Sequence, residues 1–61
     1  MIELPTHNDM LIARRKTGLN QADVAKLSGV SLATIGRLER GGDVKYSNWV
    51  KLVEFYISTS F

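Results

Sequence analysis

The stretch that decides the fold covers residues 19–41 and reads LNQADVAKLSGVSLATIGRLERG. It holds two segments of helical length, and each follows a residue whose side chain commonly caps a helix. Asn20 stands before the first segment, with Asp23 three positions later as in a capping box, and Ser31 stands before the second. The predicted helices cover residues 21–28 and 32–40.

The turn between these two helices favours a large angle between them. Gly29 suits the left-handed backbone conformation that ends a helix. Val30 and Ile35 are spaced as a hydrophobic staple that fills the angle, while the small Ala25 lets the second helix approach closely. A tight glycine turn between two short helices is typical of a helix-turn-helix motif.

Outward from this motif the chain predicts two further helices. The first covers residues 8–17, with Asn8 or Asp9 as its N-cap and Gly18 after its end. The second covers residues 46–56, with apolar side chains repeating at helical spacing. These apolar residues are Trp49, Leu52, Val53 and Tyr56. The alternation of apolar and polar residues from Ile57 to Phe61 favours an extended tail.

Length and composition limit the classes of protein to which the chain can belong. Its 61 residues suffice for one small domain, with an N-terminal arm over residues 1–7 and a C-terminal tail over residues 57–61. Because there is no cysteine and only one histidine, His7, we expect no disulfide, no metal site and no cofactor. No apolar run approaches membrane-spanning length and the start does not resemble a secretory signal, so we expect an intracellular soluble protein.

Charge is unevenly distributed along the chain. Residues 14–40 hold six basic and two acidic residues, a net charge of +4, whereas the whole chain carries only +2. All five aromatic residues lie within residues 46–61, so the basic part and the bulky apolar part are different stretches. This separation is expected if the middle of the chain binds a polyanion and its end completes the core.

The quoted stretch closely resembles the lambda-repressor/Cro-like (xenobiotic-response-element) helix-turn-helix family. The Gln-Ala-x-x-Ala opening at residues 21–25, the Gly-Val-Ser turn at residues 29–31 and the Arg-Leu-Glu-x-Gly ending at residues 37–41 carry the resemblance together. It extends back through residues 13–16 and forward to about Tyr56. The resemblance implies an all-α, compact four-to-five-helix lambda-repressor-like domain with a central helix-turn-helix.

The resemblance also implies which residues contact double-stranded DNA. The helix over residues 32–40 matches the recognition helix, which lies in the major groove. Base contacts are implied for Leu32, Ala33, Thr34 and Arg37. Phosphate contacts are implied for Asn20, Gln21, Ser31, Arg40 and Lys45. Arg37 can read guanine bidentately, whereas Leu32 and Ala33 offer only methyl contacts where family members often carry polar residues.

Two further features follow from the resemblance. Arg14 and Glu39 match a structural ion pair that links the first helix to the end of the recognition helix. Family domains usually have a fifth helix, for which only residues 57–61 remain, so we expect a homodimer that uses the C-terminal segment. The expected dimer contacts are Phe55, Tyr56, Ile57 and Phe61.

The sequence as a whole predicts a DNA-binding transcription regulator rather than an enzyme. The most specific expectation is a Cro-type repressor that binds a palindromic operator as a homodimer. We expect it to be prokaryotic or phage-encoded and to act in the cytoplasm of the host cell. Two alternatives stay open. One is an antitoxin that binds a toxin protein and regulates its own synthesis. The other is a protein-interaction module that no longer binds DNA, for which the apolar Leu32 and Ala33 are the indication.

Overall fold

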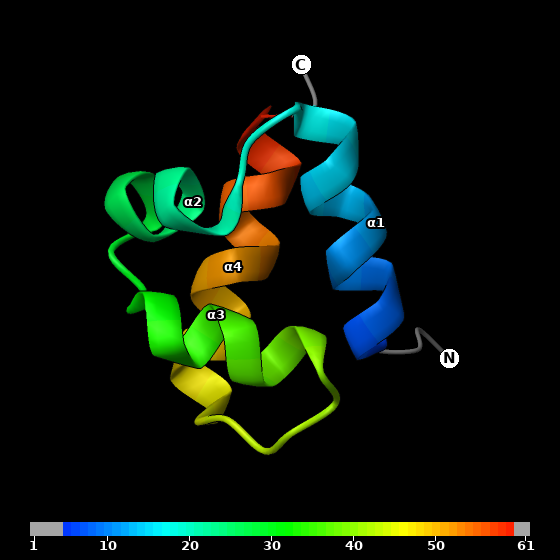
Figure 1. Ribbon diagram of the computed structural model, residues 1–61, viewed down its shortest axis with the longest axis vertical. Coiled ribbons are helices and arrows are strands. Elements are labelled where there is room, and N and C mark those ends of the chain that lie inside the picture. Colours follow the sequence, from blue (N-terminus) through cyan, green and yellow to red (C-terminus); the bar gives the residue numbers. More distant parts are fainter. Residues whose placement is uncertain (1–4, 60–61) are drawn as a thin grey trace.

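A computed structural model describes residues 5–59, and all regular structure in that range is helical (Figure 1). The helices are α1 (His7–Thr17), α2 (Gln21–Ser28), α3 (Leu32–Glu39) and α4 (Tyr46–Thr59). The prediction of an all-α fold around a central helix-turn-helix is confirmed, with α2 and α3 as that pair.

The start of α1 differs from the prediction. The N-cap is Thr6, whose hydroxyl accepts a hydrogen bond from the N–H of Asp9 at 3.1 Å, while the Asp9 carboxylate accepts one from the N–H of Thr6 at 2.9 Å. The prediction of Asn8 or Asp9 as N-cap is wrong, because Asp9 instead closes the capping box from inside the first turn. His7 is therefore helical, and the predicted arm is shorter by one residue.

The helix-turn-helix is capped as its sequence predicts. Asn20 and Asp23 form a reciprocal capping box, and the Ser31 hydroxyl accepts from the N–H of Thr34 at 3.2 Å. Gly29 has a φ of 80°, the left-handed conformation expected at the turn. The only difference is that α3 ends one residue early, since Arg40 is its C-cap.

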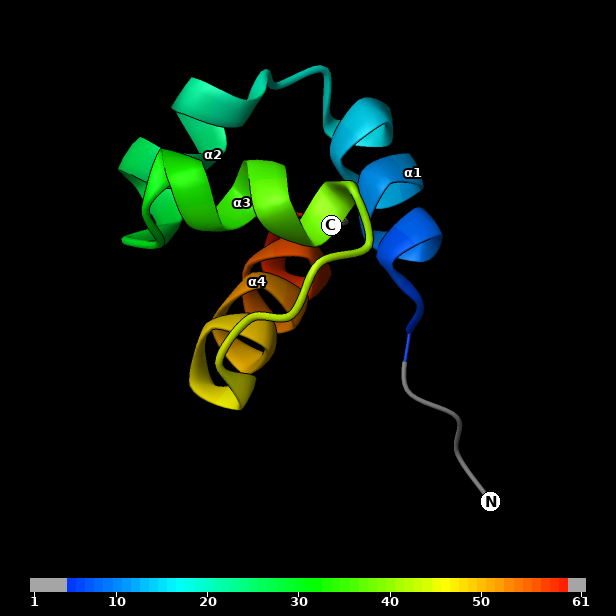
Figure 2. The ribbon, with the colours of Figure 1, turned by 60° about the horizontal axis from the view of Figure 1, so that its bottom comes forward.

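The core lies between the four helices and receives side chains from each of them. Figure 2 shows α3 lying across α4, with α1 beside both. The buried side chains of the core are Met10, Val24, Val30, Ile35, Leu38, Leu52 and Tyr56, and the half-buried Trp49 packs against them. Because α3 presents Ile35 and Leu38 inward, its opposite face is left at the surface.

The end of α4 corrects one expectation and limits another. Residues 57–59 continue the helix, so the predicted extended tail is wrong there. The hydroxyls of Ser58 and Thr59 donate to the carbonyls of Phe55 and Tyr56, at 2.8 and 3.1 Å, within the last turn of the helix. Tyr56 is only 8% exposed, so it faces the core as its apolar spacing predicts, and little of its surface is available for the expected dimer contact. Phe61 lies outside the described residues.

Candidate nucleic-acid interface

The outer face of α3 carries the four residues expected to contact bases. Leu32 is 50% exposed, Ala33 and Arg37 are also exposed, and Thr34 is half-buried. Ser31 donates from its hydroxyl to that of Thr34 at 2.7 Å, so the cap also orients the first polar side chain of this face. The structure thus brings the expected base-contacting residues onto one accessible surface.

A groove of about 610 Å³ runs beside this face, between α3, the following loop and the start of α4. It is lined by Ala33, Thr34, Arg37, Asp43, Val44, Lys45 and Asn48. Asp43, Val44 and Asn48 were not among the residues expected to contact DNA. The sequence signal for a role in binding was the presence of the polar Asp43 and Asn48 near Lys45. Only the path of the loop shows that these residues face α3.

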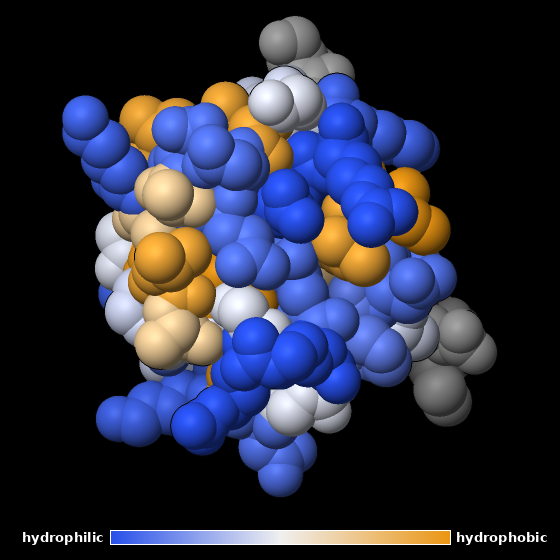
Figure 3. Space-filling view, in the orientation of Figure 1, coloured by the Kyte–Doolittle hydropathy of each residue, from blue (hydrophilic) through white to orange (hydrophobic). Residues whose placement is uncertain are grey.

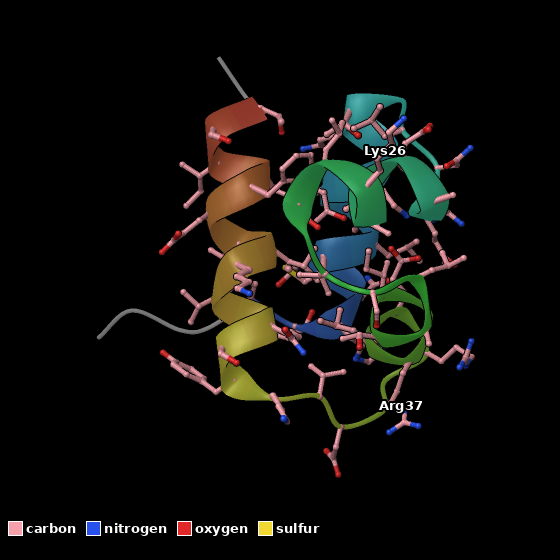
Figure 4. All side chains as sticks on the ribbon, turned by 90° about the vertical axis from the view of Figure 1, so that its left-hand side faces the viewer. Lys26 and Arg37 are labelled. Carbon is pink, nitrogen blue, oxygen red and sulfur yellow. The ribbon has the colours of Figure 1, made fainter. Side chains whose placement is uncertain are left out.

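Arg37 and Lys26 occupy different parts of the motif. Figure 4 shows Arg37 projecting from α3 on the side of the loop that leads to α4, while Lys26 lies on α2 at the other end of the helix pair. Both side chains are exposed. Of these two residues, Arg37 lines the groove and Lys26 does not.

A hydrogen-bonded network supports the back of α3. Arg14 donates to both carboxylate oxygens of Glu39, through Nε at 2.7 Å and Nη2 at 3.0 Å, and through Nη1 to the carbonyl of Leu19 at 3.1 Å. Gln21 donates from Nε2 to the same carboxylate at 2.9 Å. The network therefore ties α1, the α1–α2 loop and α2 to the last residue of α3.

The network shifts the pKa of both charged groups in it. Burial by itself raises the pKa of Glu39, but the hydrogen bonds from Arg14 and Gln21 outweigh burial and lower that pKa. The hydrogen bond to Glu39 raises the pKa of Arg14. Burial, reinforced by the nearby Glu39 charge, raises the pKa of Tyr56 to about 12. The pair is therefore ionised and Tyr56 neutral at pH 7.

This geometry bears on the phosphate contact expected from Gln21. Its side-chain N–H₂ already serves Glu39. The backbone N–H groups of the first helical residues have no partner within a helix, so Gln21 retains a donor to an anion at the start of α2. The neighbouring Asn20 uses its Oδ1 to cap α2, accepting from Asp23 at 2.8 Å, which leaves its side-chain N–H₂ for a phosphate.

Arg40 folds back along α3 towards Gly36. A Cβ atom added at Gly36 would lie 3.3 Å from Arg40 Nη1 and 3.7 Å from Gln21 Oε1. The missing side chain at Gly36 therefore leaves room for two residues that are expected to contact phosphates. Arg40 is exposed, so its guanidinium can turn towards an anion without leaving a buried site.

Lys45 stands where α4 begins. Its carbonyl accepts from the N–H groups of Asn48 and Trp49, at 3.0 and 3.1 Å, and the first turn of α4 contains no acidic residue. The partial positive charge of a helix start attracts anions. Lys45 adds a full positive charge at the same place, which suits a DNA phosphate.

The residues expected at a dimer contact are arranged differently from one another. Phe55 is half-buried and its ring meets that of Tyr56 edge-on, with the centroids 5.5 Å apart. Ile57 is 57% exposed. Together with Tyr56, Ile57 lines a mainly apolar groove of about 310 Å³ between α1 and α4, whose other lining residues are Pro5, Asp9, Met10, Ala13 and Val53.

Two other kinds of feature are absent from the described part of the chain. Among residues 5–59 no three His, Cys, Asp or Glu side chains gather as they would around a metal ion. No helix in the same range has the length and apolar character needed to cross a membrane.

Comparison with known families assigns the chain to one of them. A family model described as helix-turn-helix matches residues 11–60, which is more than half of the chain and includes all of α2, α3 and α4. This family consists of DNA-binding regulatory domains and is not an enzyme family. Comparisons with curated proteins and with solved structures gave no match. The chain therefore belongs to the lambda repressor/Cro-like helix-turn-helix family of DNA-binding transcription regulators.

Proposed function

We propose that this regulator is a Cro-type repressor that binds a palindromic operator as a homodimer. The observation that carries the proposal is the outer face of α3, where Arg37 projects into an open groove that Lys45 borders from the other side. Such a face can enter the major groove while its flanks contact the backbone. Binding at an operator represses transcription by blocking access to the promoter. The protein is prokaryotic or phage-encoded and acts in the cytoplasm of the host cell.

Each residue of the interface has a role in this proposal. Arg37 reads a guanine, Thr34 donates from its hydroxyl to a base, and the methyl groups of Leu32 and Ala33 contact thymine. Phosphates are bound by Asn20, Gln21, Ser31, Arg40 and Lys45. Arg14 and Glu39 hold the end of α3 in place without contacting DNA. The ion pair between Arg14 Nε and Glu39 Oε2, at 2.7 Å, supports this role.

Dimerisation supplies the affinity that one small domain lacks. Two copies related by a two-fold axis place two recognition helices on half-sites about 34 Å apart, one turn of DNA. We assign the contact to the groove between α1 and α4, which Tyr56 and Ile57 line, with Phe55 packed edge-on against Tyr56 outside the groove. Phe61, beyond the described residues, belongs to the same segment of the chain.

A second candidate function is favoured by one observation. Leu27 and Leu32 are 63% and 50% exposed on either side of the α2–α3 turn, and Figure 3 shows an apolar patch over that junction. A patch of this kind often binds another protein. An antitoxin that binds a toxin and also regulates its own synthesis combines this patch with DNA binding, whereas a pure interaction module does not bind DNA.

The proposal is tested by selecting bound duplexes from random DNA and then measuring their affinity across a range of salt concentrations. We expect a palindromic consensus and a steep fall in affinity with salt, because released counterions drive phosphate binding. Arg37→Ala should reduce preference at one base pair of each half-site. Lys45→Ala, which removes a positive charge at an expected phosphate contact, should weaken binding to every sequence alike and reduce the salt slope by about 1 per chain.

Lys51→Ala is the matched control, because it removes an exposed positive charge of α4 that does not line the groove. It should leave both the consensus and the salt slope close to those of the parent. Equal loss of operator and random DNA binding in Arg37→Ala would exclude the assigned base contact. A chain that binds no duplex at low salt would exclude the proposed function and leave the interaction module.

A further inference from the structure

Gly42 packs against the stem of Arg37. Its N–H donates to the carbonyl of Arg37 at 2.9 Å, which holds the loop after α3 against that residue. A Cβ atom added at Gly42 would lie 2.6 Å from Arg37 Cγ, 3.4 Å from its Cδ and 3.1 Å from its carbonyl oxygen. The Arg37 side chain therefore occupies the space that any other residue at position 42 would need.

The backbone does not explain the glycine at this position. Gly41 has a φ of 86° and needs glycine for its left-handed conformation, but Gly42 is not among the positive-φ residues. What position 42 requires is the absence of a side chain. The atoms it would displace are close to the root of Arg37, next to the helix backbone, and not at the end of a flexible side chain.

We propose that Gly42 is a positioning residue that sets the direction of the Arg37 side chain in the groove and thereby the base preference of the protein. This inference rests on the proposed base contact of Arg37. Gly42 itself touches no DNA in this scheme. Gly42 acts through the loop, whose backbone lies against Cγ and Cδ of Arg37. Arg37 can therefore adopt only those rotamers that do not clash with the Gly42 backbone.

A bidentate contact to guanine makes direction important. Both hydrogen bonds form only when the plane of the guanidinium meets the edge of the base. A methyl group at position 42 forces Arg37 to rotate near its root, or pushes the loop away and breaks the 2.9 Å hydrogen bond. Rotation near the root displaces the guanidinium at the far end of the side chain, so the bidentate contact is lost although the charge remains.

The first experiment compares base preferences of the parent, Gly42→Ala and Arg37→Ala on duplexes that vary one base pair at a time. We expect Gly42→Ala to lose preference at the same base pair as Arg37→Ala, by roughly 5- to 150-fold, the range for one bidentate contact. Its affinity for random DNA should stay within about twofold of the parent, because no charge is removed. Gly36→Ala adds the same methyl group next to Arg40 instead, and should leave the base preference unchanged.

The second experiment needs no DNA and measures the melting temperature of both single variants and of Gly42→Ala/Arg37→Ala. Since Arg37→Ala removes Cγ and Cδ, the added methyl group should lower the melting temperature less in that background. If Gly42→Ala fails to fold alone, folding of the double variant shows the same coupling. If Gly42→Ala lowers the melting temperature equally in the parent and in Arg37→Ala, the contact with Gly42 does not constrain the Arg37 side chain.

The outcomes separate this inference from the function on which it rests. Loss of preference in Arg37→Ala together with full preference in Gly42→Ala overturns the positioning role and leaves the base contact intact. No sequence preference in the parent protein overturns the proposed function. If the melting temperatures are coupled but Gly42→Ala does not lose preference at the base pair that Arg37→Ala affects, Gly42 has only a structural role. This outcome also overturns the inference.

Discussion

Arg14, Gln21 and Glu39 show how a few polar residues can hold a small helical fold together. The Glu39 side chain is 6% exposed and receives hydrogen bonds from both of the others, so almost no water remains to replace a lost partner. Removing one partner of a buried ion pair leaves the other charge unpaired, which costs about 3–5 kcal/mol. The corresponding cost for an exposed pair is about 0.2–1 kcal/mol.

We expect Arg14→Ala to lower the free energy of unfolding by about 1–3 kcal/mol at pH 7, between the ranges for exposed and buried pairs, because the pair is partly buried. The difference should shrink in acid. In the parent, Glu39 has a lowered pKa, so its stabilisation is complete above the unfolded pKa of about 4.3 and is lost as the pH falls through the folded pKa. Without Arg14 that pKa is no longer lowered by the pair.

Urea unfolding from pH 7 to pH 3 measures both effects. Lys16→Ala is the control, since it removes an exposed charge from the same turn of α1 and should change stability by no more than about 0.5 kcal/mol. A difference between parent and Arg14→Ala that stays constant with pH would contradict the assignment to Glu39.

At the scale of single elements, α3 contains an internal glycine that is not needed for its backbone. Gly36→Ala should raise the free energy of unfolding by about 0.5–1 kcal/mol, because alanine favours the helix by that amount. The new Cβ would meet Arg40 Nη1 at 3.3 Å, the end of an exposed and flexible side chain that can move. Thermal unfolding should show a rise of several degrees.

Gly41→Ala is the opposite case and serves as the comparison. Its φ of 86° is unfavourable for alanine, so this variant should unfold at a lower temperature. The cause is the backbone conformation, because a Cβ atom at Gly41 would meet its nearest neighbour, His7, at an ordinary contact distance of 3.5 Å. A fall in melting temperature for Gly36→Ala would mean that Arg40 and Gln21 need the space that the glycine leaves.

The element boundaries also show what local sequence can predict. The starts of α2 and α3 follow from Asn20 and Ser31, because each is the only good capping residue directly before its apolar pattern. The start of α1 was ambiguous, since Thr6, Asn8 and Asp9 can all cap, and the reciprocal capping box between Thr6 and Asp9 places the cap at Thr6. The end of α4 was missed because the alternating apolar and polar residues after Tyr56 fit a strand as well as a helix end, and local pattern does not decide between them.

At the scale of the whole molecule, periodicity identified the exposed face of α3 but not the groove beside it. Ile35 and Leu38 point inward at helical spacing, so the opposite positions follow from the sequence. The groove requires the loop to return alongside α3, and the approach of Gly42 to Arg37 depends on that path. Neither has a signature in the sequence, because both are contacts between segments with irregular backbone.

The proposed dimer makes a prediction about the whole molecule. Sedimentation at micromolar concentration should show a dimer for the parent and a monomer for Ile57→Glu, because a charge at this 57% exposed position opposes apolar contact across the α1–α4 groove. Leu27→Glu, a similar change at an exposed leucine of α2, should remain dimeric. A parent that sediments only as a monomer would refute the dimer.

The Asp43 carboxylate in the groove beside α3 has a consequence for the search along DNA. A negative charge close to the phosphates weakens binding to every sequence alike, whereas a guanine read by Arg37 compensates only at the correct site. A genome presents millions of incorrect sites, which compete for the same protein molecules. Under the proposed function, the groove would shorten the time spent on each incorrect site, so that this weakly charged chain releases random DNA quickly and remains available for its operator.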